Sequence, residues 1–172
     1  LDLDTGRAPA ALEDLRPLVR DPRSVHRLLD VLPGRVVYAT NRRNGVDFDV
    51  VIHSAVTGEE QVVYDRGGLI LGVAVSPDSR YLVVTLPGAL PMSDRLLLVN
   101  TMPATEHEHV LVLTDGTEHA KYTHIAWLPD DSGLVVTTNS GRDYSGVAHL
   151  DPRTGALRWL VRSEEHEVTG WL

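Results

Sequence analysis

Two loops of the sequence carry polar side chains of the kinds that bind ligands. One holds two consecutive arginines, and the other holds an arginine, an acid and a tyrosine in a row. Guanidinium groups bind carboxylates through paired hydrogen bonds, so these loops are candidates for substrate binding, with solvated loop arginines as the alternative. The candidate residues are Arg42, Arg43, Arg142, Asp143 and Tyr144.

Histidine supplies one further candidate. An imidazole binds a carboxylate or titrates near neutral pH. His119 and His124 flank the start of a short apolar run, and His124 is the sixth candidate for substrate binding, the alternative being a hydrogen-bonded strand residue. No second group completes a catalytic set with either histidine.

The segment "EHEH", Glu106 to His109, has the composition of a metal site. On a strand, His107 and His109 would share one face. A structural or catalytic zinc site needs third and fourth ligands that this spacing does not supply. We therefore expect no metal and no cofactor.

No serine of the chain lies in the G-x-S-x-G pattern that exposes a nucleophile on a strained strand-to-helix turn. Ser145 precedes Gly146 but has Asp143 two residues before it. The absence of cysteine excludes disulfides, thiolate metal sites and cysteine nucleophiles. We expect no catalytic residue in these 172 residues.

Composition is that of a folded domain: 42% of the 172 residues are apolar and 23% are charged. The net charge of −8 disfavours a nucleic-acid partner. No apolar run approaches the roughly 20 residues needed to span a bilayer, and we expect a cytoplasmic protein with no membrane partner. The first ten residues, "LDLDTGRAPA", lack the basic and apolar regions of a signal peptide. Because they also lack an initiating Met, we expect a fragment or a processed product.

Apolar residues mostly alternate with a period of two, in short runs rich in β-branched side chains and bounded by turn residues. These runs predict strands, namely "RVVYAT" from Arg35, "DVVIHS" from Asp49, "RLLLVN" from Arg95 and "HVLVLT" from His109. Only Pro9 to Arg16 is predicted to be helical, and Pro17 would end that helix.

Two segments repeat: "VAVSPDSRYLVVT" from Val73 and "IAWLPDDSGLVVTT" from Ile125, whose Pro77 and Pro129 lie 52 residues apart (129 − 77). Two loops of the chain also correspond to each other: "TNRRNGVDFDV" from Thr40 and "TNSGRDYSGV" from Thr138. A repeat of about 45 to 50 residues with four strands is the size of a propeller blade. The sequence therefore predicts an all-β fold of the β-propeller class.

The predicted domains are an N-terminal segment at 1–23 with a short helix and a partial propeller at 24–172. Four-stranded antiparallel blades are expected at about 24–65, 69–114 and 122–162, with the first strand of a fourth at 166–172. Trp127 and Trp171 would then occupy equivalent positions and pack between blades. Propellers usually close with four to eight blades, so we expect either further chain or association between copies.

At these repeats the chain resembles the β-propeller of the prolyl oligopeptidase family of serine peptidases, especially the acylaminoacyl-peptidase and dipeptidyl-peptidase-like branch common in bacteria. Ser76 to Arg80 and Leu128 to Gly133 are similar to its Ser-Pro-Asp-Gly turn, and the two Thr-Asn loops look like its loop between second and third strands. The resemblance covers about Ser24 to Leu172. TolB-like propellers share the turn and are the second choice.

The family resemblance implies a partner: an α/β-hydrolase domain, in the same polypeptide or a second chain, that carries Ser, Asp and His. The propeller would cap that active site and filter peptide substrates by size, without catalysis of its own. One alternative is a TolB-like scaffold that binds another protein. A second is a propeller enzyme such as a polysaccharide lyase, working through His or Arg near the axis.

Overall fold

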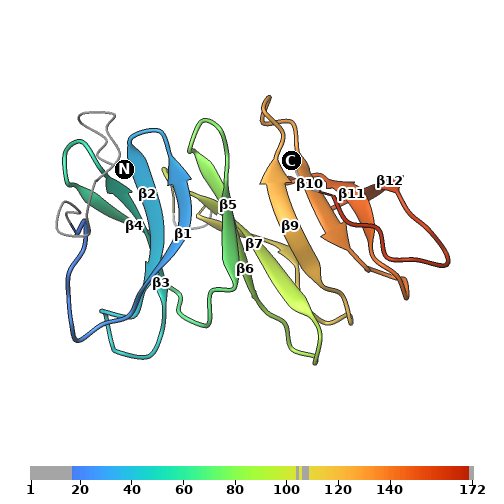
Figure 1. Cartoon of the computed structure of the whole chain (residues 1–172), viewed down its shortest axis with the longest axis horizontal. Coiled ribbons are helices and arrows are strands. Elements are labelled where there is room, and N and C mark those ends of the chain that lie inside the picture. The colour runs from blue at the N-terminus through green and yellow to red at the C-terminus, as the bar shows by residue number, and fades with distance from the viewer. Residues whose placement is uncertain (1–16, 104, 106–108, 171–172) are drawn as a thin grey trace, which may run out of the picture. The chain divides into compact units, whose positions relative to one another are not determined.

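The computed structural model describes residues 17–103, 105 and 109–170, and within these ranges the chain contains strands and no helix. The strands form three four-stranded antiparallel sheets in which neighbours follow one another along the chain (Figure 1). The first sheet, blade one, holds β1 (His26–Leu32), β2 (Arg35–Thr40), β3 (Asp49–Ser54) and β4 (Glu60–Tyr64). Blade two holds β5 (Gly72–Val75), β6 (Tyr81–Pro87), β7 (Asp94–Asn100) and β8 (Val110–Thr114). Blade three holds β9 (Tyr122–Trp127), β10 (Leu134–Thr138), β11 (Gly146–Leu150) and β12 (Leu157–Val161).

The predicted all-β class and the three four-stranded blades are confirmed. The four runs read as strands correspond to β2, β3, β7 and β8. The predicted helix at Pro9 to Arg16 lies outside the described residues, as do Trp171 and Leu172 of the expected next blade. No helix in the described part of the chain is long and apolar enough to cross a membrane.

The chain divides into two compact units, Leu1–Gly68 and Leu69–Leu172. The first contains blade one, whose two central strands are buried at consecutive positions, β2 from Val37 to Thr40 and β3 from Asp49 to His53. One face of this sheet carries side chains that are at most 7% exposed, namely Val37, Ala39, Val50, Ile52 and Val63. The opposite face of these strands is buried as well, with Tyr38 4% and Val51 0% exposed.

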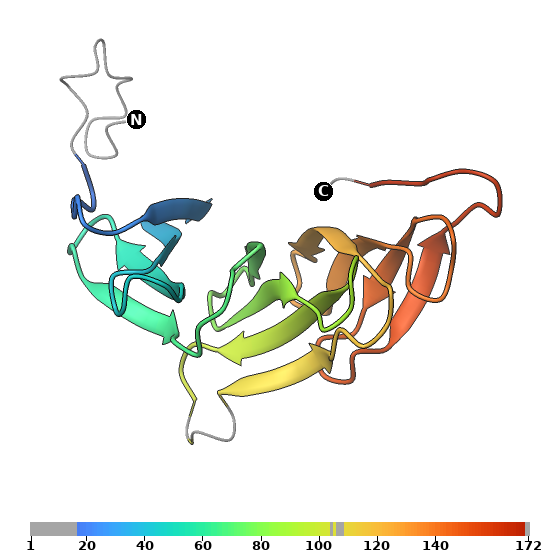
Figure 2. The same cartoon turned by 90° about the horizontal axis from the view of Figure 1, so that it is seen from below.

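The second unit packs blade two against blade three, as Figures 1 and 2 show. Figure 2 also shows β5 to β8 following one another across blade two, from green to yellow. Apolar side chains from both sheets form the core between them, including Val83 and Leu96 of blade two and Leu134, Val136 and Leu150 of blade three, all fully buried. Burial of this surface is the main force that holds the two blades together.

The Ser-Pro-Asp turn of blade two is held by side chains that bond its backbone. Ser76 Oγ donates to Asp78 Oδ1 over 2.6 Å and accepts from the Tyr81 amide at 2.9 Å. Asp78 Oδ1 also accepts from the Arg80 amide at 2.9 Å. The Asp78 carboxylate therefore accepts hydrogen bonds from turn groups that have no backbone acceptor.

Blade three repeats this device with different residues. Asp130 Oδ1 accepts from the amide of Ser132 at 3.1 Å and from its hydroxyl at 2.6 Å. The next position has a left-handed backbone in both turns, with φ of 59° at Ser79 and 57° at Asp131. Glycine is the residue that adopts this conformation without steric cost, and this explains the resemblance to a Ser-Pro-Asp-Gly turn.

Gly155 allows blade three to approach blade two closely. It follows Thr154 in the turn between β11 and β12 and has a φ of 71°. A Cβ atom at this position would lie 2.6 Å from the carbonyl oxygen of Leu113 on β8. Both the backbone conformation and the contact between blades therefore require glycine here.

Candidate functional site

Arg42 of blade one binds within its own sheet. Its guanidinium forms an ion pair with Glu60 of β4, and the Tyr38 hydroxyl donates to the same carboxylate over 2.7 Å. His53 Nδ1 lies 3.5 Å from Glu60 as well. These bonds, led by that from Arg42, hold the pKa of Glu60 below its usual range, whereas burial raises the pKa of Tyr38. Arg42 thus has a structural partner.

Arg43 also pairs with an acid of its own blade. Its Nε lies 3.1 and 3.0 Å from the two oxygens of Asp49, a residue that is 4% exposed at the start of β3. The Arg43 side chain itself remains 44% exposed. Substrate binding by Arg42 and Arg43 stays a prediction, and ligand binding would compete with these pairs.

Arg142 of blade three holds the segment that follows β12. Its guanidinium bonds Glu164 Oε1 at 3.0 Å and the carbonyl oxygen of Ser163, and it lies over the Trp159 ring at 5.4 Å. Asp143 and Tyr144 are exposed beside it and line a polar hollow of about 410 Å³. Their role in substrate binding stays a prediction.

The two Thr-Asn loops share a structural role. Asn41 Oδ1 accepts from the Val25 amide at 2.7 Å, and Asn139 Oδ1 accepts from the Lys121 amide at 2.8 Å. Each asparagine thereby holds the chain just before the first strand of its own blade. This shared hydrogen bond from a backbone amide to the asparagine side chain explains why the Thr-Asn sequence occurs in both blades.

His124 lies on a β-bulge of β9. The pairing of β9 with β10 shifts between Val135 and Thr137, which leaves one extra residue on β9. His124 has a φ of 47°, a left-handed conformation that is uncommon outside glycine. Bulges and such backbone strain are enriched near functional sites because they redirect side chains. The other histidine, His119, is exposed, and its Nδ1 lies 2.8 Å from the carbonyl oxygen of Pro91.

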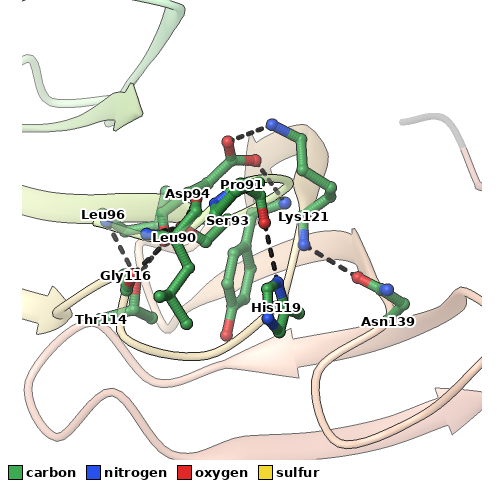
Figure 3. Close-up of polar contacts among 11 residues, drawn as sticks. Leu90, Pro91, Ser93, Asp94, Leu96, Thr114, Gly116, His119, Lys121 and Asn139 are labelled. Carbon is green, nitrogen blue, oxygen red and sulfur yellow. Dashed lines mark hydrogen bonds and ion pairs between the residues drawn. The ribbon is translucent and has the colours of Figure 1, made fainter. Parts of the chain in front are cut away.

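An ion pair between a buried carboxylate and a partly exposed ammonium joins blades two and three (Figure 3). Asp94, 2% exposed at the start of β7, binds the ammonium of Lys121 from the following blade. Its second oxygen accepts from the backbone amide of Tyr122 at 2.8 Å. One carboxylate therefore fixes both the side chain and the backbone where β9 begins.

Neighbouring loops support this pair. The Ser93 hydroxyl donates to the carbonyl oxygen of Leu90 over 2.6 Å and lies 3.0 Å from that of Gly116 (Figure 3). The Asp94 amide donates to the carbonyl oxygen of Ala120 over 2.8 Å. These bonds tie the loop before β7 to the loop before β9, so the position of Asp94 is set by backbone contacts on both sides.

Hollows lie on both sides of Asp94. One, of about 400 Å³, is lined by residues that include Asp115, Glu118 and Tyr122. The other, of about 420 Å³, lies between the first strands of the two blades. We name this second cavity the junction hollow; its lining includes Thr85, Asp94, Lys121, Thr123, His124 and Ile125.

The chemistry of the junction hollow is that of binding. It combines a cation, an imidazole and hydroxyl groups with apolar walls, the composition of many ligand sites. Within the described residues no group of three or more His, Cys, Asp or Glu could hold a metal ion. Of "EHEH", only His109 is described, immediately before β8, and the other three residues lie outside the description.

Sequence reasoning missed Asp94 and Lys121, which are 27 positions apart and belong to different blades. Two signals pointed to them. Lys121 is the only lysine of the chain, and Asp94 opens a third strand as Asp49 does in blade one. A buried acid at the start of an apolar strand requires a cation or donors.

Comparisons with known proteins show the fold. No protein-family model and no curated protein matches the chain in sequence. Among solved structures, a puromycin hydrolase is 22% identical with a TM-score of 0.60, over 81% of this chain and 23% of its own. A structure from a study of two prolyl endopeptidases is 16% identical with a TM-score of 0.58, over 84% and 23%. TolB from Acinetobacter baumannii is 15% identical with a TM-score of 0.55, over 76% and 30%. The chain thus spans less than a third of each structure, and the likeness identifies β-propeller blades.

Proposed function

We propose that this chain is the non-catalytic propeller portion of a serine hydrolase of the prolyl oligopeptidase kind. The observation that carries the proposal is the structural likeness to a puromycin hydrolase and a prolyl endopeptidase over about four-fifths of the chain. The Ser-Pro-Asp turn of blade two and the Leu-Pro-Asp turn of blade three, which resemble that family's turn, support it from the sequence side.

The contacts of the side chains in the candidate site support a non-catalytic role for these blades. Its ionisable groups are engaged in pairs that position backbone, as Asp94 does for β9 and Arg142 does for the segment after β12. A nucleophile with an adjacent base is the arrangement that acyl transfer needs. We place that chemistry on an α/β-hydrolase domain, in the same polypeptide or a second chain.

A propeller placed over an active site would act as a filter. Rigid sheets admit short or unfolded peptides and exclude folded proteins, and they remove bulk water from the reaction. Remaining blades, or a second copy of this chain, would complete the ring around the apolar sheet faces. We place the protein in the cytoplasm.

The test uses the full polypeptide from which this chain comes. One cleavable sequence is presented as a free peptide of about ten residues, within an unfolded polypeptide, and inside a loop of a folded domain. We expect kcat/KM to be at least tenfold lower for the folded substrate than for the free peptide. Equal cleavage of all three substrates would contradict the filter.

A TolB-like scaffold is the second candidate, favoured by the likeness to TolB. A scaffold would bind a protein partner in a fixed ratio and would hydrolyse none of the three substrates. Stoichiometric binding without hydrolysis, measured on the same full polypeptide, would therefore select the scaffold.

A further inference from the structure

Lys121 is distinctive in both sequence and structure. The chain has 16 Lys and Arg residues, and Lys121 is the only lysine among them. It lies in the lining of the junction hollow, between the first strands of blades two and three. Unlike a guanidinium, its ammonium is a compact charge with three donors that rotate to suit a ligand.

The ammonium retains capacity for a ligand. Within the described residues its one acidic partner is Asp94, which is 2% exposed. The Lys121 side chain is 36% exposed, so it is accessible from the hollow while it stays paired. Asp94 in turn accepts the Tyr122 amide at 2.8 Å, so its negative charge is compensated from two sides. Asp94 also lines the hollow, so an incoming anion would be bound by the remaining N–H donors of the Lys121 ammonium beside that carboxylate.

The remaining walls suit the end of a peptide. Thr85 and Thr123 supply hydroxyl groups, and the bulged residue His124 supplies an imidazole. Leu71 and Ile125 supply apolar surface for a side chain. A volume of about 420 Å³ lies in the range of sites for small ligands.

We propose that the junction hollow binds the carboxyl-terminal carboxylate of a short peptide, with Lys121 as the primary anion-binding group. Thr85, Thr123 and His124 line the space around that carboxylate. Recognition of a carboxylate follows from the hollow itself, whereas the choice of a peptide as its source rests on the proposed function.

The single lysine makes the proposal directly measurable. Lys121 is the only lysine in residues 1–172, so its acetylation by an N-hydroxysuccinimide ester can be followed by mass spectrometry of the peptide that contains it. Three additives are compared: an N-acetylated tripeptide with a free carboxyl terminus, the same tripeptide as its C-terminal amide, and succinate. We expect the free acid to slow acetylation of Lys121 at least fivefold and the amide to have no effect.

A test variant and a matched control variant are compared in a fluorescence-polarisation assay with a dye-labelled tripeptide acid. Lys121→Gln should weaken binding at least tenfold. Arg95→Gln removes the same charge from an exposed neighbour of Asp94 outside the lining of the hollow, and it should leave binding unchanged. If Lys121→Gln does not fold, the acetylation measurement on the unmodified protein still decides.

The outcomes separate cleanly. Absence of protection by the tripeptide acid, or equal protection by acid and amide, would overturn the carboxylate site. Equal protection by succinate would overturn the peptide as the ligand and assign the hollow to small organic acids. If the tripeptide acid protects Lys121 but the polypeptide has no hydrolase activity, the carboxylate site is supported and the proposed function is contradicted. If the polypeptide hydrolyses peptides but the tripeptide acid does not protect Lys121, the proposed function is supported and the carboxylate site is contradicted.

Discussion

The indole nitrogen of Trp127 donates a hydrogen bond to the carbonyl oxygen of Ala74 over 2.9 Å, and the two residues belong to the first strands of neighbouring blades. Trp127 is the last residue of β9, and at the other end of β9 the backbone amide of Tyr122 donates to Asp94 of blade two. Strand β9 is therefore fixed to blade two at both of its ends. The junction hollow lies between these two attachments.

Replacement of Trp127 by Phe should destabilise the contact between blades. Phe fills part of the indole volume but cannot donate to the carbonyl oxygen of Ala74, a residue that is 6% exposed, so this hydrogen bond between the blades is lost. We expect a loss of about 1 to 2 kcal/mol in the free energy of unfolding, measured by chemical denaturation. Trp159→Phe is the control, because in the described part of the chain the Trp159 indole makes no hydrogen bond, and it should cost less. Equal losses in the two variants would contradict this role of Trp127.

Replacement of Asp94 by Asn should reveal the strength of the ion pair. Asn can still accept from the Tyr122 amide but carries no charge for Lys121. We expect a loss of about 1 to 3 kcal/mol. A double-mutant cycle with Lys121→Gln should give a coupling energy of about 1 kcal/mol, because Lys121 is partly solvated. A coupling of zero would show that Asp94 acts only through the backbone.

Much of this fold could be predicted from sequence, because each blade repeats its local chemistry. Pro77 and Pro129 marked equivalent turns, and alternation of apolar residues located the strands. The partners of the arginines could not be read in this way, since Glu60 lies 18 positions from Arg42 across two strand pairings. Contacts between blades, such as that of Asp94 with Lys121, depend on how the sheets pack, which no local pattern encodes.

Replacement of Ser79 by Gly should stabilise the turn of blade two. Ser79 has a φ of 59°, where a Cβ atom is unfavourable. We expect Ser79→Gly to be more stable than Ser79→Ala by about 1 kcal/mol, measured by thermal and chemical unfolding of both variants. If alanine equals glycine, the left-handed conformation at this position carries no strain.

The stability of blade one should fall in acid. The bond from Arg42, together with that from Tyr38, lowers the pKa of Glu60 below its ordinary value of 4.5. The unfolded chain therefore takes up a proton first, so stability is present above pH 4.5 and is lost as the pH falls through the lower folded pKa. We expect hydrogen exchange of the β2 to β4 amides, corrected for intrinsic rates, to quicken below pH 4.5.

Glu60→Gln is the matched variant, because it keeps the size of the side chain and removes the titrating group. Its blade-one amides should exchange faster at neutral pH, and their protection should change less between pH 6 and pH 3. An acid response identical to that of the parent would assign the effect to another carboxylate.

The central proposal is that these blades cap a serine hydrolase whose nucleophile lies elsewhere. The most direct measurement is reaction of the full polypeptide, or of the complex in which it occurs, with a fluorophosphonate, followed by mass-spectrometric location of the adduct. We predict one modified serine, outside residues 1–172 and within a G-x-S-x-G sequence. A full polypeptide and complex that take up no fluorophosphonate, or that take it up on a serine within residues 1–172, would contradict the proposal.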